Sequence, residues 1–223
     1  MNTKDFYKYN EIISFYEKFN SPINEYLKYI KNCKQVGFGP EFNQKLDCLP
    51  DGVKKLSPGL KFNYDLNNLP STITHLFIMN VNYCGNINFL PESLKVLVLN
   101  GQHKIEKFEN LPNVKYLEVY YLPIIKNLPD SIECLILKCN ANLKSYGLNG
   151  INQTQFEIIN LPKSLETFIV YEKTFLMFQK EFEKIKKVLP FVNDERRMRN
   201  DGYFEKCVIF TKNKTEKYLS DYD

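Results

Sequence analysis

Apolar residues recur along this chain at fixed distances from a repeated Leu-Pro pair. Relative to the leucine of each pair, apolar side chains lie three residues before it and four, seven and nine residues after it, with a shift of one residue at Val114 and Leu117. The leucines of the pairs are Leu49, Leu69, Leu90, Leu111, Leu128 and Leu161. The first four are spaced 20 or 21 residues apart, and such a period is typical of a solenoid. One repeat is too short to bury its apolar residues alone, so stacked repeats must form a continuous core.

Each repeat ends in two apolar residues separated by one other residue, which predicts one short strand. In Leu76-Phe77-Ile78, for example, the two-residue spacing places Leu76 and Ile78 on one strand face. Strands of successive repeats should pair in parallel. The Leu-Pro pair lies outside the strand, where the missing N–H of proline removes no ladder bond, and the asparagine that often precedes the pair predicts hydrogen bonds within the turn. These asparagines are Asn68, Asn110, Asn127 and Asn160.

Different patterns at the two ends predict caps on the repeats. Apolar residues of segment 4–19 recur at helical spacing, which predicts an N-terminal helix. Those of segment 174–189 predict an amphipathic helix that ends before Pro190, followed by a short strand at Cys207–Thr211. A loop insertion is predicted near residues 139–156. The chain is thus predicted to be one leucine-rich-repeat-like α/β solenoid, with an N-terminal helical cap at 1–18, repeats at 19–171, and a C-terminal helix, strand and tail at 172–223.

Phenylalanine–asparagine pairs open several repeats. The segments FNSPI and FNQKL begin at Phe19 and Phe42, and the segments LPSTI and LPESL begin at Leu69 and Leu90. This combination resembles the FNIP repeat, a relative of the leucine-rich repeat, over roughly residues 19–171. The resemblance implies an origin in social amoebae or in their giant viruses. It also implies recognition of host proteins or of the ubiquitin pathway.

The strand residues that alternate with the core positions point away from the core and are largely apolar. A solvated sheet face would be more polar, so this face is either covered or binds a partner. We predict a protein-binding surface, because aromatic residues are enriched on it. Its residues are Phe77, Val98, Tyr116, Glu118, Tyr120, Ile136, Ile169 and Tyr171. The alternative is a structural protein that forms a homodimer through the same apolar face.

Composition and charge narrow the classes of function. Hydrophobic residues make up 43% of the chain and the net charge is +4. This charge is modest, and the densest basic cluster, residues 195–199, lacks an aromatic stacking pattern, so we expect no nucleic-acid partner. We expect no membrane span, since no apolar run is long enough, and no signal peptide. The protein is therefore expected in the cytoplasm, in the host cytoplasm if it is viral, with its six cysteines reduced.

Candidate catalytic and metal-binding residues are few. His75 and His103 are the only histidines, and neither lies near a serine or cysteine at the spacing of a catalytic triad. Cys134 and Cys139 are close in sequence but form no CxxC pair. The Gly37-x-Gly39 motif lacks the third glycine of a dinucleotide-binding loop. We therefore expect a protein that is not an enzyme and holds no cofactor and no metal.

Overall fold

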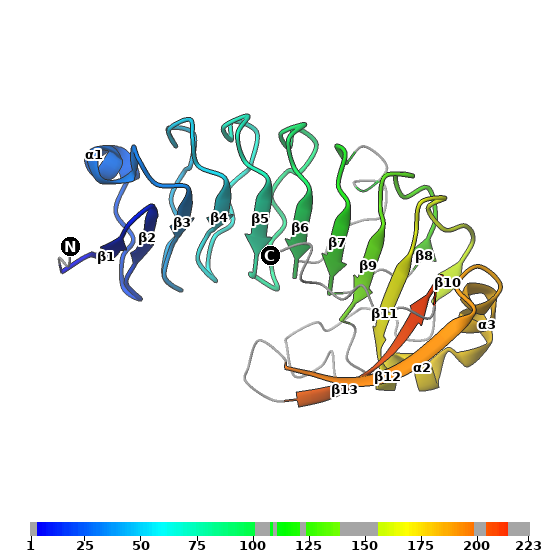
Figure 1. Ribbon diagram of the computed structural model, residues 1–223. Helices are drawn as coiled ribbons and strands as arrows, with labels where there is room; N and C mark the ends of the chain where they lie inside the picture. Colours follow the sequence, from blue (N-terminus) through cyan, green and yellow to red (C-terminus); the bar gives the residue numbers. More distant parts are fainter. Residues whose placement is uncertain are drawn as a thin grey trace. The chain divides into compact units, whose positions relative to one another are not determined.

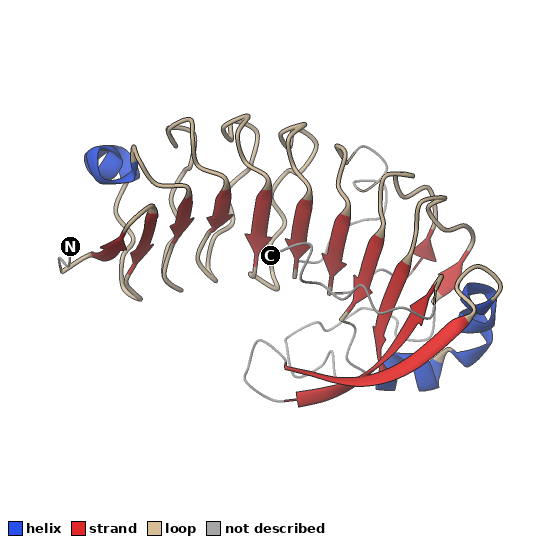
Figure 2. Ribbon diagram, in the orientation of Figure 1, coloured by secondary structure: helices blue, strands red, loops and turns tan. Residues whose placement is uncertain are grey.

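Strands dominate the computed structural model of the chain, as Figure 2 shows. The structure describes residues 4–100, 108, 111–120, 124–138, 156–198 and 204–213. The chain divides into two compact units, Met1–Val114 and Lys115–Asp223. Both units contain parallel strands contributed by successive repeats, one strand from each repeat.

The N-terminal unit begins with a hairpin and continues with parallel strands. Its elements are β1 (Phe6–Tyr9), β2 (Ile12–Phe15), η1 (Ile23–Tyr26), α1 (Leu27–Ile30), β3 (Gln35–Gly37), β4 (Lys55–Ser57), β5 (His75–Ile78) and β6 (Val96–Leu99). Strand β1 pairs antiparallel with β2. From β2 to β6 each strand pairs in parallel with the next one in the chain, as can be followed in Figure 1. The predicted parallel solenoid is therefore confirmed in this unit.

The C-terminal unit contains further repeats and an antiparallel end. Its elements are β7 (Tyr116–Val119), β8 (Ile124–Ile125), β9 (Cys134–Leu137), β10 (Glu157–Ile158), β11 (Thr167–Tyr171), α2 (Glu172–Met177), α3 (Gln179–Lys186), β12 (Phe191–Met198) and β13 (Phe204–Thr211). Strands β7, β9 and β11 pair in parallel. Strand β13 pairs antiparallel with both β11 and β12. On the other side of the repeats, β8 and β10 form a small parallel sheet.

The apolar positions set by the Leu-Pro register form the core. The residues four after the leucine are fully buried in the described repeats: Val53, Ile73, Leu94, Ile132, Leu165 and the shifted Val114. Four of the turns close in the same way: the carbonyl of Pro70, Pro91, Pro129 or Pro162 accepts a hydrogen bond from the N–H three residues later, as from Ile73 to Pro70 at 3.2 Å. At Pro112 this bond comes from Val114, two residues later. The shorter turn explains why the apolar residues of that repeat come one position early.

The predicted N-terminal helix over residues 4–19 is wrong, because this segment forms the β1–β2 hairpin. Asn10 adopts a φ of 50° in the connecting turn, a conformation that asparagine tolerates better than most residues. The hairpin buries Phe6, Ile13 and Phe15, whereas Tyr9 is 61% exposed. Apolar residues at 6, 9, 12, 13 and 16 fit a helical stripe and a hairpin equally well. The hairpin forms because β2 extends the parallel sheet of the repeats.

At the C-terminus the prediction is only partly right. The helix predicted over 174–189 is present as α2 and α3, which meet at Phe178, and the predicted strand at Cys207–Thr211 lies within β13. Strand β12 was not predicted, and it includes most of the basic cluster at 195–199. The edge of the last repeat strand is covered by β13 rather than by a helix.

The α/β character expected of a leucine-rich repeat is not found. In the described parts of the repeats, only η1 and α1 are helical. The segments between strands are short and contain the Leu-Pro turn, and proline disfavours helix both at its own position and at the preceding residue. The architecture is therefore a β-solenoid. The predicted insertion near 139–156 lies outside the described residues except for Phe156, which packs against Phe178 and Phe182.

Candidate partner-binding face

In the C-terminal unit, strand register aligns the predicted binding residues in rows on the face opposite the core. Glu118 lies beside Ile136, and Ile136 lies beside Ile169. However, these three side chains are only 8%, 4% and 1% exposed. Tyr116 and Tyr171 are also buried, and Tyr120 is half-buried. Coverage within the chain therefore accounts for the apolar character of this face, and a role of these residues in binding stays a prediction.

An ion pair lies among these buried side chains. Glu118 pairs with Lys138, and their side chains are 11% and 15% exposed. The Tyr116 hydroxyl donates a hydrogen bond to Glu118 Oε2 at 2.8 Å. A charge removed from water is costly unless it is paired and hydrogen-bonded. Lys138 and Tyr116 thus explain how a carboxylate is accommodated in an apolar column, which indicates a structural role for Glu118.

On the N-terminal unit the same strand face is accessible. Its side chains form two rows, one of Tyr9, Ile12, Gln35, Lys55 and His75, the other of Tyr7, Ser14, Gly37, Ser57 and Phe77. We call these two rows the β1–β5 face. Tyr7 and Tyr9 are exposed, and Ser57 and Phe77 are half-buried. The rows continue on β6 with Val96 and Val98, which are buried, so the accessible face ends at β5.

Small residues occupy the middle of the β1–β5 face. Ser14, Gly37 and Ser57 follow one another in the second row, with Tyr7 at one end and Phe77 at the other. A Cβ at Gly37 would have only the Ser14 hydroxyl as a neighbour, at 3.6 Å. The backbone of β2, β3 and β4 is therefore covered by little side-chain bulk here. Phe77 belongs to the predicted set, whereas Tyr7 and Tyr9 were missed because their segment was predicted as a helix.

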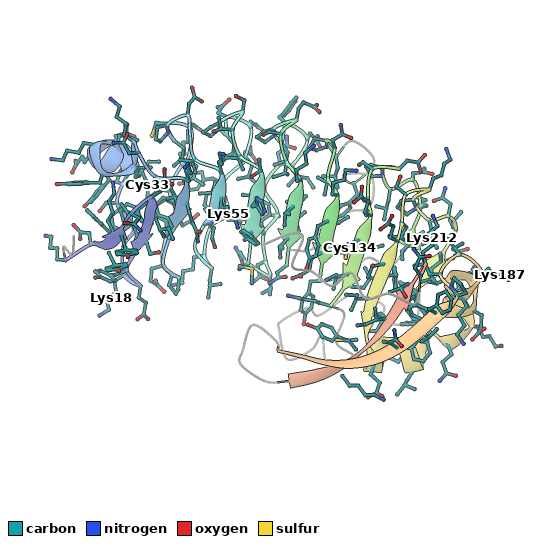
Figure 3. All side chains as sticks on the ribbon, viewed as in Figure 1. Lys18, Cys33, Lys55, Cys134, Lys187 and Lys212 are labelled. Atoms are coloured by element: carbon teal, nitrogen blue, oxygen red, sulfur yellow. The ribbon has the colours of Figure 1, made fainter. Side chains whose placement is uncertain are left out.

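Lysines line the edge at which these strands begin. The carbonyl of Lys34 accepts the N–H of Lys54, that of Lys54 accepts the N–H of Thr74, and that of Thr74 accepts the N–H of Lys95, at 2.7 to 2.9 Å. These residues therefore stack in successive repeats. Lys54 and Lys95 are exposed, and Lys55, labelled in Figure 3, is half-buried on β4. Lys34 pairs with Glu11 at 2.7 Å, but Lys54, Lys55 and Lys95 pair with no carboxylate among the described residues. We call these three the lysine edge.

The Phe-Asn pairs link neighbouring repeats in two ways. Inside the unit, the ring of Phe42 stacks on those of Phe19 and Phe62, with centroids 5.9 and 6.5 Å apart. Outside, Asn20 Oδ1 accepts the N–H of Asn43 at 2.8 Å, and Asn43 Oδ1 accepts the N–H of Asn63 at 3.0 Å. The pair is thus a structural element of the repeat. The sequence showed the motif but not this asparagine ladder.

The asparagine bonds predicted before the Leu-Pro pairs occur in the C-terminal unit. There the N–H of Asn127 donates to Asn160 Oδ1 at 2.8 Å. Asn68 is exposed, and Asn110 lies outside the described residues.

The family model of the FNIP Repeat matches residues 42–81. This stretch contains the stacked Phe42 and Phe62 and the ladder from Asn43 to Asn63. The chain contains FNIP repeats. Among curated proteins, none matches it. The stretch that matches the family model thus contains phenylalanine and asparagine side chains that join neighbouring repeats.

A groove of about 440 Å³ lies elsewhere on the N-terminal unit of this FNIP-repeat protein. Its lining includes Ile23, Asn24, Gln44, Cys48 and Tyr64. Gln44 Nε2 already donates to the carbonyl of Asn20 at 3.1 Å, and the Cys48 thiol donates to Asn24 Oδ1 at 2.8 Å. Since these polar groups have partners within the chain, the groove is the weaker candidate for a binding site.

The candidate catalytic residues do not assemble into a site in the described part of the FNIP-repeat protein. His75 lies on β5 with its Nδ1 2.8 Å from the Thr74 hydroxyl, and Cys134 is buried in β9; His103 and Cys139 lie outside the described residues. Within that same part, no three His, Cys, Asp or Glu side chains gather as metal ligands would. None of the described helices has the length and apolar character needed to cross a bilayer.

Proposed function

We propose that this FNIP-repeat protein is a non-catalytic scaffold that binds a protein partner through the β1–β5 face. The observation that carries the proposal is the change in exposure along the strand rows. Tyr7 and Tyr9 are 43% and 61% exposed, whereas Val96 and Val98, in the same rows on β6, are buried. Aromatic side chains supply much of the binding energy of protein interfaces, and a stacked sheet face offers an extended surface for a partner.

The family resemblance suggests the setting of this role. We propose that the partner is a host protein or a component of the ubiquitin pathway. The binding would take place in the cytoplasm of an amoeba, or of an amoeba infected by a giant virus. A homodimer through the apolar face is less well supported, since Ile136 and Ile169 are already buried within one chain.

The test places a bulky side chain in the middle of the face. Ser57→Trp should block a partner while leaving the core untouched, and Asn68→Trp is the matched control because Asn68 is exposed and lies outside the face. Tagged wild-type protein and both variants are used for affinity capture from an amoebal lysate, with circular dichroism as the check on folding. We expect the wild type and Asn68→Trp to capture the same protein and Ser57→Trp to lose it. Capture by Ser57→Trp at the wild-type level would refute the assigned face. Light scattering on the same samples would detect the homodimer.

A further inference from the structure

We infer that the β1–β5 face binds an extended acidic peptide segment, with carboxylates at the lysine edge and an apolar side chain against Phe77. The inference rests on the proposed function and adds the chemistry of the partner. Three features support it: the positive charge of the lysine edge, the small residues Ser14, Gly37 and Ser57 on the face, and the aromatic side chain of Phe77 at the end of their row.

The lysine edge lacks the carboxylates that usually neutralise surface lysines. In the described repeats of the N-terminal unit, the acidic residue stacked in the same column is Glu11, and it pairs with Lys34 at 2.7 Å. Lys54, Lys55 and Lys95 have no such partner among the described residues. Lys54 and Lys55 are adjacent in the chain, and Lys95 follows Thr74 in the same column, so the edge carries three positive charges over three successive repeats. A partner with several carboxylates would pair with these charges, and such complementarity favours both encounter and correct register.

An extended chain fits the face beside this edge. Side chains on one face of an extended peptide recur about every 6.7 Å, so three such steps, about 20 Å, match the roughly 19 Å spanned by five strands that lie about 4.8 Å apart. The small side chains of Ser14, Gly37 and Ser57 let a peptide backbone come near the sheet. Phe77, whose ring centroid is 6.3 Å from that of His75, is placed to contact an apolar side chain of the peptide. The geometry thus favours a segment in which acidic residues flank an apolar one.

Nucleic acid fits this face less well. Arginine is the residue that most often reads phosphate and base edges, and all three arginines of the chain lie at 196–199. Single strands also need aromatic side chains on which bases stack next to the cationic groups. The aromatic side chains beside Lys55 are His75 and Phe77 on β5, which are half-buried, whereas the exposed Tyr7 and Tyr9 lie on β1, three strands away from Lys55 on β4.

The test measures binding of a defined acidic probe. The probe is a fluorescein-labelled peptide that alternates glutamate and serine around a central leucine, and binding to the full chain is followed by fluorescence anisotropy. The test variant is Lys54→Glu/Lys55→Glu/Lys95→Glu. Its control, Lys18→Glu/Lys31→Glu/Lys45→Glu, changes three exposed lysines outside the face and alters the net charge equally. Ser57→Trp tests the face without changing charge.

We expect the lysine-edge variant to weaken binding by about tenfold or more and the control to change it less than about twofold. Ser57→Trp should abolish binding, and added salt should weaken it. Equal weakening by both triple variants would overturn the inference, because the peptide would then sense only net charge. Tight binding of a single-stranded DNA of similar length, lost in the lysine-edge variant, would also overturn it in favour of a nucleic-acid site.

The two proposals fail in different ways. If wild-type protein does not bind the acidic peptide but Ser57→Trp still abolishes capture of a lysate protein, the acidic partner is refuted and the scaffold stands. If Ser57→Trp changes neither peptide binding nor capture of the lysate protein, both the acidic partner and the scaffold proposal are refuted. Circular dichroism of each variant verifies that loss of binding is not loss of fold.

Discussion

Gly59 lies where the backbone of one repeat touches that of the repeat before it. A Cβ at this position would collide with the carbonyl oxygen of Gly39 and press on Phe42. Gly39 is in the equivalent place one repeat earlier, where a Cβ would collide with the backbone of Tyr16. Backbone cannot move aside as the end of a flexible side chain can. Glycine is therefore required here by contact between repeats.

We expect Gly59→Ala to lower the free energy of unfolding by about 1–3 kcal/mol, the usual cost of overpacking a tight site. Urea denaturation followed by circular dichroism measures the change. The matched control is Gly37→Ala, whose new methyl group would meet only the Ser14 hydroxyl at 3.6 Å. Equal destabilisation by the two substitutions would show that the loss of glycine, and not the contact with Gly39, is responsible.

Single residues of the candidate face were predictable only in part. The alternation of strand residues placed Phe77 on the outward face. It also placed Ile136 and Ile169 there, but alternation carries no information on whether a face is covered, and both are buried. The lysine edge was missed for a related reason. Lysines in a sequence resemble ordinary solvated surface, and only the register shows that Lys54 and Lys95 lack the partner that Lys34 has.

Among the elements, the terminal ones were the hardest to predict. The repeat register fixes β3 to β6 because their apolar residues have one possible core to face. The β1–β2 segment has no copy elsewhere in the chain, and its short apolar pattern suits a helix as well as a hairpin. Strand β12 was missed because Asn193 to Arg197 are polar, and its pairing depends on the distant β13.

The junction between α3 and β10 makes a prediction about pH. Glu181 Oε2 accepts the N–H of Ile158 at 2.9 Å and pairs with Lys184 at 2.7 Å. The hydrogen bond from Lys184, and next that from Ile158, lower the pKa of Glu181. Since the folded-state pKa lies below the unfolded one, the stabilisation is complete above the ordinary glutamate pKa of about 4.3 and is lost as the pH falls through the folded-state value.

We therefore expect acidification below about pH 5 to destabilise the wild type more than Glu181→Gln. Glutamine still accepts a hydrogen bond from Ile158 but carries no titrating charge. The difference in stability between wild type and variant therefore reports on Glu181 alone. It excludes the contribution of Asp130, a second carboxyl group whose pKa is lowered, in this case by Lys163. Urea denaturation at a series of pH values measures this difference. A difference that stays constant from neutral to acidic pH would contradict the role given to Glu181.

For the whole molecule, the period near 20 residues was enough to predict a solenoid with parallel strands, because only stacking buries such short repeats. It was not enough to predict that the chain divides at Val114 into two compact units. The repeat beginning at Leu111 departs from the register, since Val114 bonds to Pro112 one residue early. A pattern of apolar positions shows this shift, but it does not show the division into two units.

In a solenoid, interactions are mainly between neighbouring repeats, so damage should stay local. Leu56 on β4 and Leu135 on β9 hold the same place in their repeats, and both are fully buried. Replacing either with alanine should cost about 2–5 kcal/mol. We expect Leu56→Ala to raise amide hydrogen exchange mainly on β3, β4 and β5, and Leu135→Ala to raise it mainly on β7, β9 and β11. Hydrogen exchange with mass spectrometry resolves these strands under native conditions. If each substitution raised exchange equally in both units, the chain would unfold as one cooperative body and the local description would be wrong.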